Sequence, residues 1–164
     1  MINKYEEFKS FFLKFIENKK NNYHALVWIN GKPKIGKNVY IGGFSEINAK
    51  GGKVNIGNNC DIASFVSINV ADSHLKILKL ENKIIKKNIT IEDNVFIGSH
   101  CVILGGTTIK NNSVIAAGTV LRGETVPEYS LVIGNPATIK KEYYKKYDKA
   151  QHTKYKKKIF SKSK

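Results

Sequence analysis

One histidine in this chain lies in a pattern that could support acid–base chemistry. His74 follows a carboxylate by two residues, in Asp72-Ser73-His74. An imidazole with an unperturbed pKa near ~6.5 is suited to taking a proton from a hydroxyl or an amine at neutral pH. Asp72 could orient that base and stabilise its protonated form, or it could be a surface-turn residue. The remaining histidines are interpreted as structural or incidental: His24, His100 and His152.

A period of six residues surrounds this motif. Branched aliphatic residues recur at this interval through Ile91, Ile97, Ile103, Ile109, Ile115 and Leu121. Two earlier runs, from Ile29 to Ile47 and from Ile56 to Ile68, keep the same interval. Helices repeat about every 3.6 residues and strands about every two, so a fixed period of six predicts a coil of short, flat, stacked segments.

A second class of position lies four residues after most of these aliphatic residues. It holds small or moderate side chains that share a strand face with them and should also point inward: Val39, Ser45, Cys60, Val66, Val95, Cys101, Thr107, Ser113 and Thr119. Glycine and asparagine fall between, at the expected corners, because both tolerate left-handed backbone. The two cysteines are therefore expected to fill the core rather than to bind zinc or form a disulfide.

The period is interrupted twice. The step from Ile47 to Ile56 is nine residues and predicts a small bulge. The step from Ile68 to Ile91 is 23 residues and predicts a protruding loop at about residues 71–88. Long loops on rigid scaffolds often carry functional residues, and His74 lies on this one.

The two ends of the chain differ from the repeat. Asn3 and Glu6 are typical of a capping box, which predicts an amphipathic helix within residues 1–22 whose aromatic face covers the first coil. Residues 140–164 hold eleven lysines and two acidic residues, and they carry most of the net charge of +15. We interpret them as a basic, helical, solvated tail rather than a nucleic-acid site, because Arg122 is the chain's one arginine.

Length and composition predict one domain, at residues 23–139, between these ends. A chain of 164 residues with 41% hydrophobic residues can bury one continuous core. No stretch approaches the ~20 apolar residues that cross a bilayer, and Met1 to Lys20 does not resemble a secretory signal. We therefore expect a cytoplasmic protein with no transmembrane segment and no nucleic-acid partner.

Four features together resemble a known family: the six-residue period, the loop with His74, the stretch Ile91–Ser99 and the closing Val132–Ala137. They are similar to the hexapeptide-repeat acyltransferases, above all the galactoside, maltose and xenobiotic acetyltransferase branch, over roughly residues 29–141. The resemblance implies an all-β fold, a left-handed parallel β-helix with three hexapeptides per coil. It also implies a homotrimer with active sites in the clefts between subunits.

The same resemblance implies acetyl-CoA as the co-substrate, no metal, and direct attack of the acceptor on the thioester. It assigns the general base to His74, with Asp72 beside it. The CoA contacts that it implies run from the thioester to the nucleotide phosphates: Ser99, Ala117, Arg122 and Lys141.

We therefore expect an acetyltransferase that acts on a hydroxyl or amino group of a carbohydrate, such as a polysaccharide unit or a nucleotide-linked sugar. Asn69 is a candidate for binding an acceptor hydroxyl. A non-catalytic trimeric β-helix scaffold and an acyltransferase with a non-sugar acceptor remain as alternatives. The carbonic anhydrase type on the same scaffold needs three histidine ligands, whereas the coiled region holds only His74 and His100.

Overall fold

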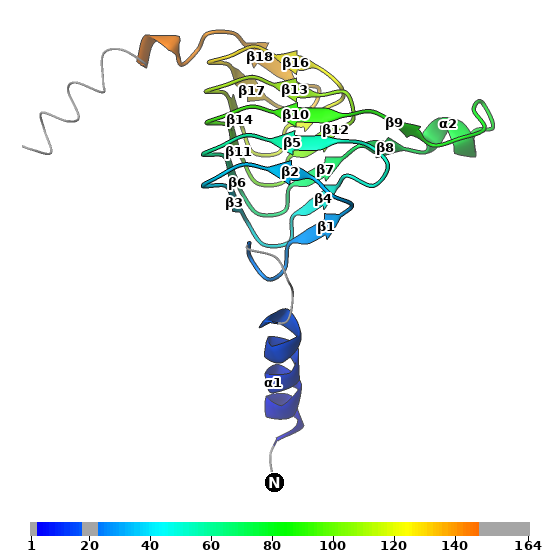
Figure 1. The fold of residues 1–164 in the computed structure, drawn as a ribbon. Coiled ribbons are helices and arrows are strands. Elements are labelled where there is room, and N and C mark those ends of the chain that lie inside the picture. The colour runs from blue at the N-terminus through cyan, green and yellow to red at the C-terminus, as the bar shows by residue number, and fades with distance from the viewer. Residues whose placement is uncertain (1–2, 18–22, 148–164) are drawn as a thin grey trace, which may run out of the picture.

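A computed structural model describes residues 3–17 and 23–147 of the chain. Short parallel strands wind into a β-helix of about five turns with three flat sides (Figure 1). Sheet A contains β1 (Trp28–Asn30), β4 (Glu46–Asn48), β7 (Ser67–Asn69), β12 (Val102–Leu104) and β15 (Val120–Leu121). Sheet B contains β2 (Lys34–Ile35), β5 (Val54–Ile56), β10 (Ile89–Ile91), β13 (Thr108–Ile109) and β16 (Thr125–Val126). Sheet C contains β3 (Tyr40–Ile41), β6 (Asp61–Ile62), β11 (Phe96–Ile97), β14 (Val114–Ile115), β17 (Leu131–Ile133) and β18 (Thr138–Lys140).

The strand register confirms that three hexapeptides make one coil. Trp28 of β1 pairs with Glu46 of β4, eighteen residues later. Glu46 pairs in turn with Ser67, and Ser67 with Val102, so these two coils take up the nine-residue step and the long excursion. Both interruptions leave the sheets through a corner, and the stacking of the strands continues undisturbed above and below them.

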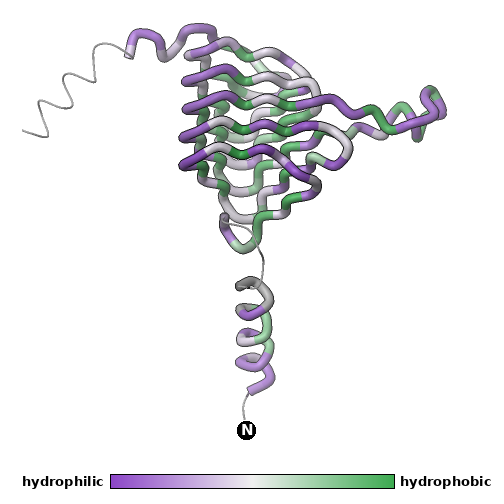
Figure 2. The backbone as a smooth tube through the Cα atoms, viewed as in Figure 1, coloured by the Kyte–Doolittle hydropathy of each residue, from purple (hydrophilic) through white to green (hydrophobic). Residues whose placement is uncertain are grey.

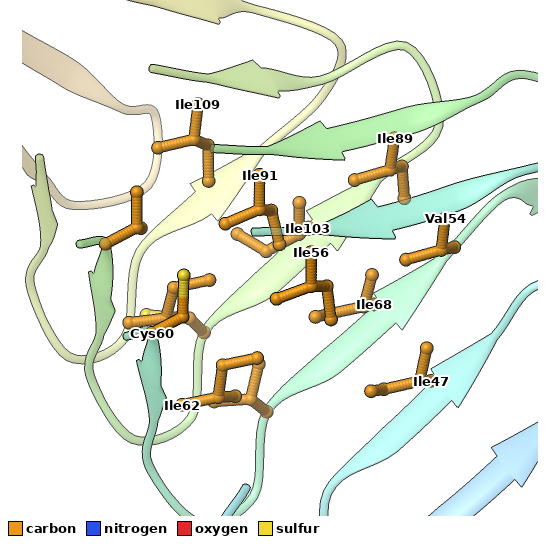
Figure 3. Packing of buried hydrophobic residues seen from close by; sticks show 14 of the residues in the cluster. Ile47, Val54, Ile56, Cys60, Ile62, Ile68, Ile89, Ile91, Ile103 and Ile109 are labelled. Atoms are coloured by element: carbon orange, nitrogen blue, oxygen red, sulfur yellow. The ribbon is translucent and has the colours of Figure 1, made fainter. Parts of the chain in front are cut away.

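The periodic aliphatic residues form the core, as the sequence predicts. Figure 3 shows isoleucines from all three sheets, among them Ile47, Ile56 and Ile62, pointing into one continuous interior. Along the coil, hydrophobic and hydrophilic residues alternate (Figure 2), because successive strand residues face opposite sides of a sheet.

The second class of inward positions is also buried, apart from the partly buried Val39, and its polar members bond to the backbone of neighbouring segments. The Ser45 hydroxyl donates to the Ala63 carbonyl at 3.0 Å and accepts from the Val66 amide at 3.1 Å. The Cys60 and Cys101 thiols each donate to a carbonyl, at 3.1 and 3.0 Å, and burial raises the pKa of both. Both cysteines are free and buried, so they fill the core as expected.

The N-terminal helix α1 (Lys4–Glu17) begins where the sequence predicts, but it does not cover the first coil. The Asn3 side chain accepts a hydrogen bond from the Tyr5 amide at 3.1 Å and caps the helix. The helix projects from the end of the coil (Figure 1), and its aromatic side chains, such as Phe8 and Phe11, are exposed. The expectation of a helical cover is therefore wrong. Val27 and Tyr23, from the segment just before β1, pack against the core at that end instead.

At the other end, the last strand reverses direction. β18 pairs with β17 in the antiparallel sense, so Lys140 is part of a strand and not the start of a helical tail. Ala137 and Ile139 pack against the core there. Residues 148–164 of the expected tail lie outside the described residues. No helix in the described part of the chain is long and apolar enough to span a membrane.

The long excursion forms an arm at the corner between sheets A and B. It contains β8 (Ala71–Asp72), the short helix α2 (His74–Ile77) and β9 (Ile85–Lys86), and β8 and β9 pair in the antiparallel sense. The arm extends away from the coil (Figure 1). Its apolar side chains Ile77, Leu78 and Leu80 are exposed.

Candidate functional site

The arm places His74 and Asp72 side by side. Asp72 ends β8, and its Oδ1 lies 2.5 Å from Nδ1 of His74, the first residue of α2. The same oxygen accepts a hydrogen bond from the His74 backbone amide at 3.1 Å. An ionised carboxylate can only accept, so in the neutral imidazole Nδ1 carries the proton and Nε2 keeps its lone pair. The pair therefore presents a basic nitrogen on an exposed arm.

The pKa of Asp72 is held below its ordinary value, first by the hydrogen bond from the His74 side chain and then by that from the His74 amide. The contribution of this pair to stability is therefore present above the ordinary pKa of Asp and is lost as the pH falls through the lowered value. We expect His74→Ala to raise the pKa of Asp72 towards the ordinary value. An NMR titration of the Asp72 carboxyl carbon checks this, and an unchanged pKa would contradict the described pair.

Two of the residues expected to contact CoA lie together at the corner between sheets C and A. Ser99 connects β11 to β12, and Ala117 connects β14 to β15 one coil above. The Gly118 amide donates to the Ser99 carbonyl at 2.9 Å. A Cβ at Gly98 would lie 2.5 Å from the Ala117 backbone nitrogen, so the two coils approach closely only because residue 98 is glycine. The backbone amides of Ser99 and Ala117 donate to no group in the described residues.

The other two candidates are separated from each other. Arg122 follows β15, and its Nη1 donates to Oδ1 of Asn135, just after β17, at 2.9 Å. Arg122 thus reaches the upper end of the corner that holds Ala117. Lys141 follows β18, whose last residue lies beside Leu131 at the other end of sheet C. One chain therefore does not bring Lys141 to Arg122.

Asn69 lies at the base of the arm, at the end of β7. Its side-chain oxygen accepts hydrogen bonds from the Ala71 amide at 2.9 Å and from Asn48 Nδ2 at 3.3 Å. The oxygen thus fixes the point where the chain leaves the coil.

His74 and the corner with Ser99 are not adjacent within one chain. The arm leaves at the junction of sheets A and B, whereas Ser99 lies at the junction of sheets C and A. Sheet A lies between these junctions, and the arm points away from the coil (Figure 1). Within one chain, the arm and this corner therefore do not form a common site.

The sequence interpretation missed a column of stacked rings at the same corner. Phe44 stacks on Phe65 with ring centroids 5.0 Å apart, and Phe65 stacks on His100 at 4.8 Å. Each follows an inward isoleucine by three residues, and that spacing could have revealed the column. His100 was interpreted as an incidental corner residue. It does lie at a corner, with φ 59°, but its ring belongs to this column.

Metal ligands are not gathered in the described part of the chain. Within residues 3–17 and 23–147, no group of three or more His, Cys, Asp or Glu side chains could hold a metal ion.

Comparison with known proteins bears directly on this arrangement. Residues 88–123 match a family described as bacterial transferase hexapeptide (six repeats). The coil of this chain is built of hexapeptide repeats. No curated protein sequence matched it.

Three solved structures similar to this hexapeptide-repeat protein are acetyltransferases. A hexapeptide-repeat-containing acetyltransferase from Vibrio cholerae is 29% identical, with a TM-score of 0.60 over 70% of this chain and 69% of that one. A galactoside acetyltransferase in complex with coenzyme A is 32% identical, with a TM-score of 0.60 over 71% and 64%. A polySia-specific acetyltransferase is 28% identical, with a TM-score of 0.55 over 70% and 60%. These matches confirm the resemblance to the hexapeptide-repeat acetyltransferases, although the chain spans less than two thirds of the last two proteins.

Proposed function

We propose that this hexapeptide-repeat protein transfers an acetyl group from acetyl-CoA to a hydroxyl or amino group of a carbohydrate. The observation that carries the proposal is the His74–Asp72 pair on the arm of a coil shared with acetyltransferases. The carbohydrate class is supported by two similar structures whose names specify a galactoside and polySia. Asn69, at the base of the arm, is the residue proposed to bind an acceptor hydroxyl.

The reaction needs a base, a positioned nucleophile and donors for an oxyanion, because a thioester is already activated. Nε2 of His74 takes the proton of the acceptor hydroxyl or amine, whose oxygen or nitrogen attacks the thioester carbonyl carbon. Asp72 stabilises the imidazolium that forms. When the tetrahedral intermediate collapses, the carbon–sulfur bond breaks and the CoA thiolate takes the proton back from Nε2.

The oxyanion and the donor chain are assigned to the corner between sheets C and A. The unbonded backbone amides of Ser99 and Ala117 can donate to the oxyanion and to the pantetheine arm. Arg122 can bind the nucleotide phosphates by exchanging its bond with Asn135 for a bond to phosphate. Lys141 would have to come from another copy, because it follows β18 at the end of sheet C that lies away from this corner.

A homotrimer is part of the proposal. In one chain sheet A separates the arm from the corner with Ser99, so His74 of one copy would act beside Ser99 of the next. The exposed apolar residues of the arm, including Ile77 and Leu80, are suited to contact with that neighbour.

The test is thiol release from acetyl-CoA in the presence of a panel of sugars, amino sugars and nucleotide sugars. We expect acceptor-dependent release with at least one carbohydrate, and mass spectrometry should find a product heavier by one acetyl group. If thiol is released with simple amines or alcohols but with no carbohydrate, the acceptor is not a sugar, and the alternative of an acyltransferase with a non-sugar acceptor is favoured. No release with any acceptor, together with no binding of CoA, would favour the scaffold alternative.

A further inference from the structure

The aromatic column, defined as Phe44, Phe65 and His100, lies at positions with left-handed backbone. Their φ angles are 62°, 61° and 59°. Phenylalanine is uncommon in this region, whereas asparagine and histidine are among the enriched residues. At the corner between sheets B and C, four of the corresponding positions hold asparagines, Asn38, Asn59, Asn94 and Asn112, and the last holds Tyr129. In the described residues, rings on successive levels are therefore found at the corner between sheets C and A and not at this one.

The column ends abruptly at His100. Backbone hydrogen bonds connect its levels: His100 donates to Ser64, and Gly118 donates to Ser99, the residue before His100. Gly118 is thus the next residue in the column, with φ 71° and no side chain. A Cβ built on Gly118 would meet no atom within 4 Å. One face of the His100 ring is covered by Phe65, and the opposite face looks onto this open space.

The open space has the height and surroundings of a stacking site for a flat group. The rings below it are spaced by 5.0 and 4.8 Å with interplanar angles of 5° and 7°, so the three rings are nearly parallel. The space lies at the level of Gly118, next to Ala117, and the Ala117 amide is unbonded in the described residues. A planar group that stacks on His100 could therefore accept a hydrogen bond at its edge.

We propose that the open face of His100 stacks on a planar amide of the pantetheine arm of acetyl-CoA. This inference rests on the proposed function, which puts the donor chain along Ser99 and Ala117. An amide is flat, so it can stack on the His100 ring, and its carbonyl can accept a hydrogen bond from the Ala117 N–H. His100 is thus a positioning residue for the donor, and Phe65 holds its ring in place from below.

Three substitutions test the site, with CoA and 3′,5′-ADP as probes in titration calorimetry. Gly118→Asn keeps a residue that tolerates positive φ and fills the open space with a side chain. His100→Asn removes the ring. His100→Phe keeps a ring, and phenylalanine already occupies the equivalent positions on the two lower levels of the column, at Phe44 and Phe65. We expect the Kd for CoA to rise roughly tenfold in the two asparagine variants and to stay near wild type in His100→Phe, since one ring contact contributes about a factor of ten or less.

The two probes separate the pantetheine arm from the nucleotide. 3′,5′-ADP lacks the arm, so its Kd should be unchanged in all three variants. Gly106→Asn is the matched control, because Gly106 is also a glycine with positive φ, at 98°, but lies at the corner between sheets A and B. The Gly106→Asn variant should bind both probes with the Kd of the wild type.

The outcomes distinguish this inference from the proposed function. If the wild type binds no CoA, the proposed function and the inference both fail. If the wild type binds CoA and the asparagine variants bind it equally well, the inference is overturned and the proposed function stands. The stacking of an amide on the ring would also be overturned if the variants bound CoA and 3′,5′-ADP more weakly by the same factor. It would be overturned as well if His100→Phe raised the Kd for CoA as much as His100→Asn does.

Discussion

His74→Ala is expected to lower kcat by roughly 10²–10⁴, the usual share of a general base. The variant removes the nitrogen that takes the acceptor proton and leaves the carboxylate of Asp72 without its partner at 2.5 Å. The side chain lies exposed on the arm, so the β-helix should keep its melting temperature. Steady-state kinetics with the best acceptor of the panel measure the effect, and calorimetry should show an unchanged Kd for CoA.

Two further variants identify the cause of that loss. Lys76→Ala changes an exposed neighbour on α2 and should retain wild-type kcat. Asp72→Asn keeps the shape of the side chain but removes the charge that stabilises the imidazolium, so it should lower kcat by less than His74→Ala. Wild-type turnover in His74→Ala would refute the assignment of the base, and loss of CoA binding would indicate a structural role instead.

Ile109→Ala is expected to lower the free energy of unfolding by about 2–5 kcal/mol. Ile109 is fully buried in β13, with Ile91 in the strand below and Val126 in the strand above. Removing most of its side chain leaves a cavity between coils that backbone hydrogen bonds hold at fixed spacing, so the coils cannot close around it. Urea denaturation followed by circular dichroism measures the change.

The matched control is Ile77→Ala, on the arm, where the same side chain is 75% exposed. Its free energy of unfolding should change by less than about 0.5 kcal/mol, as for ordinary surface substitutions. If Ile109→Ala cost no more than Ile77→Ala, the periodic aliphatic residues would not be the core that stabilises the coil.

Most of the coil could be predicted from the sequence, because each coil repeats the same local pattern. An inward aliphatic residue every six positions specifies the strands, the corners and the eighteen-residue register of β1 on β4. The same pattern predicts that the two cysteines are buried, because they occupy inward positions of the repeat. It also predicts the arm with His74, because His74 lies where the repeat is interrupted.

The sequence alone did not determine which residues meet across coils or at the ends. The approach of Phe44, Phe65 and His100 depends on the stacking of coils that are 21 and 35 residues apart in the chain, and no local pattern reports the orientation of their rings. The same is true of the ends, where Tyr23 and Val27 pack on the core and α1 does not.

The sequence by itself determined the repeat, the core and the placement of Asp72 two residues before His74, because these depend on neighbours along one coil or one turn. Only the tertiary structure decided that the arm and Ser99 occupy different corners of the coil. The physical reason is that each coil consists of three short strands and makes one full turn about the axis of the β-helix. The distance between Ser99 and His74 in space is therefore set by the sides of the coil that lie between them and not by the 25 residues that separate them in sequence.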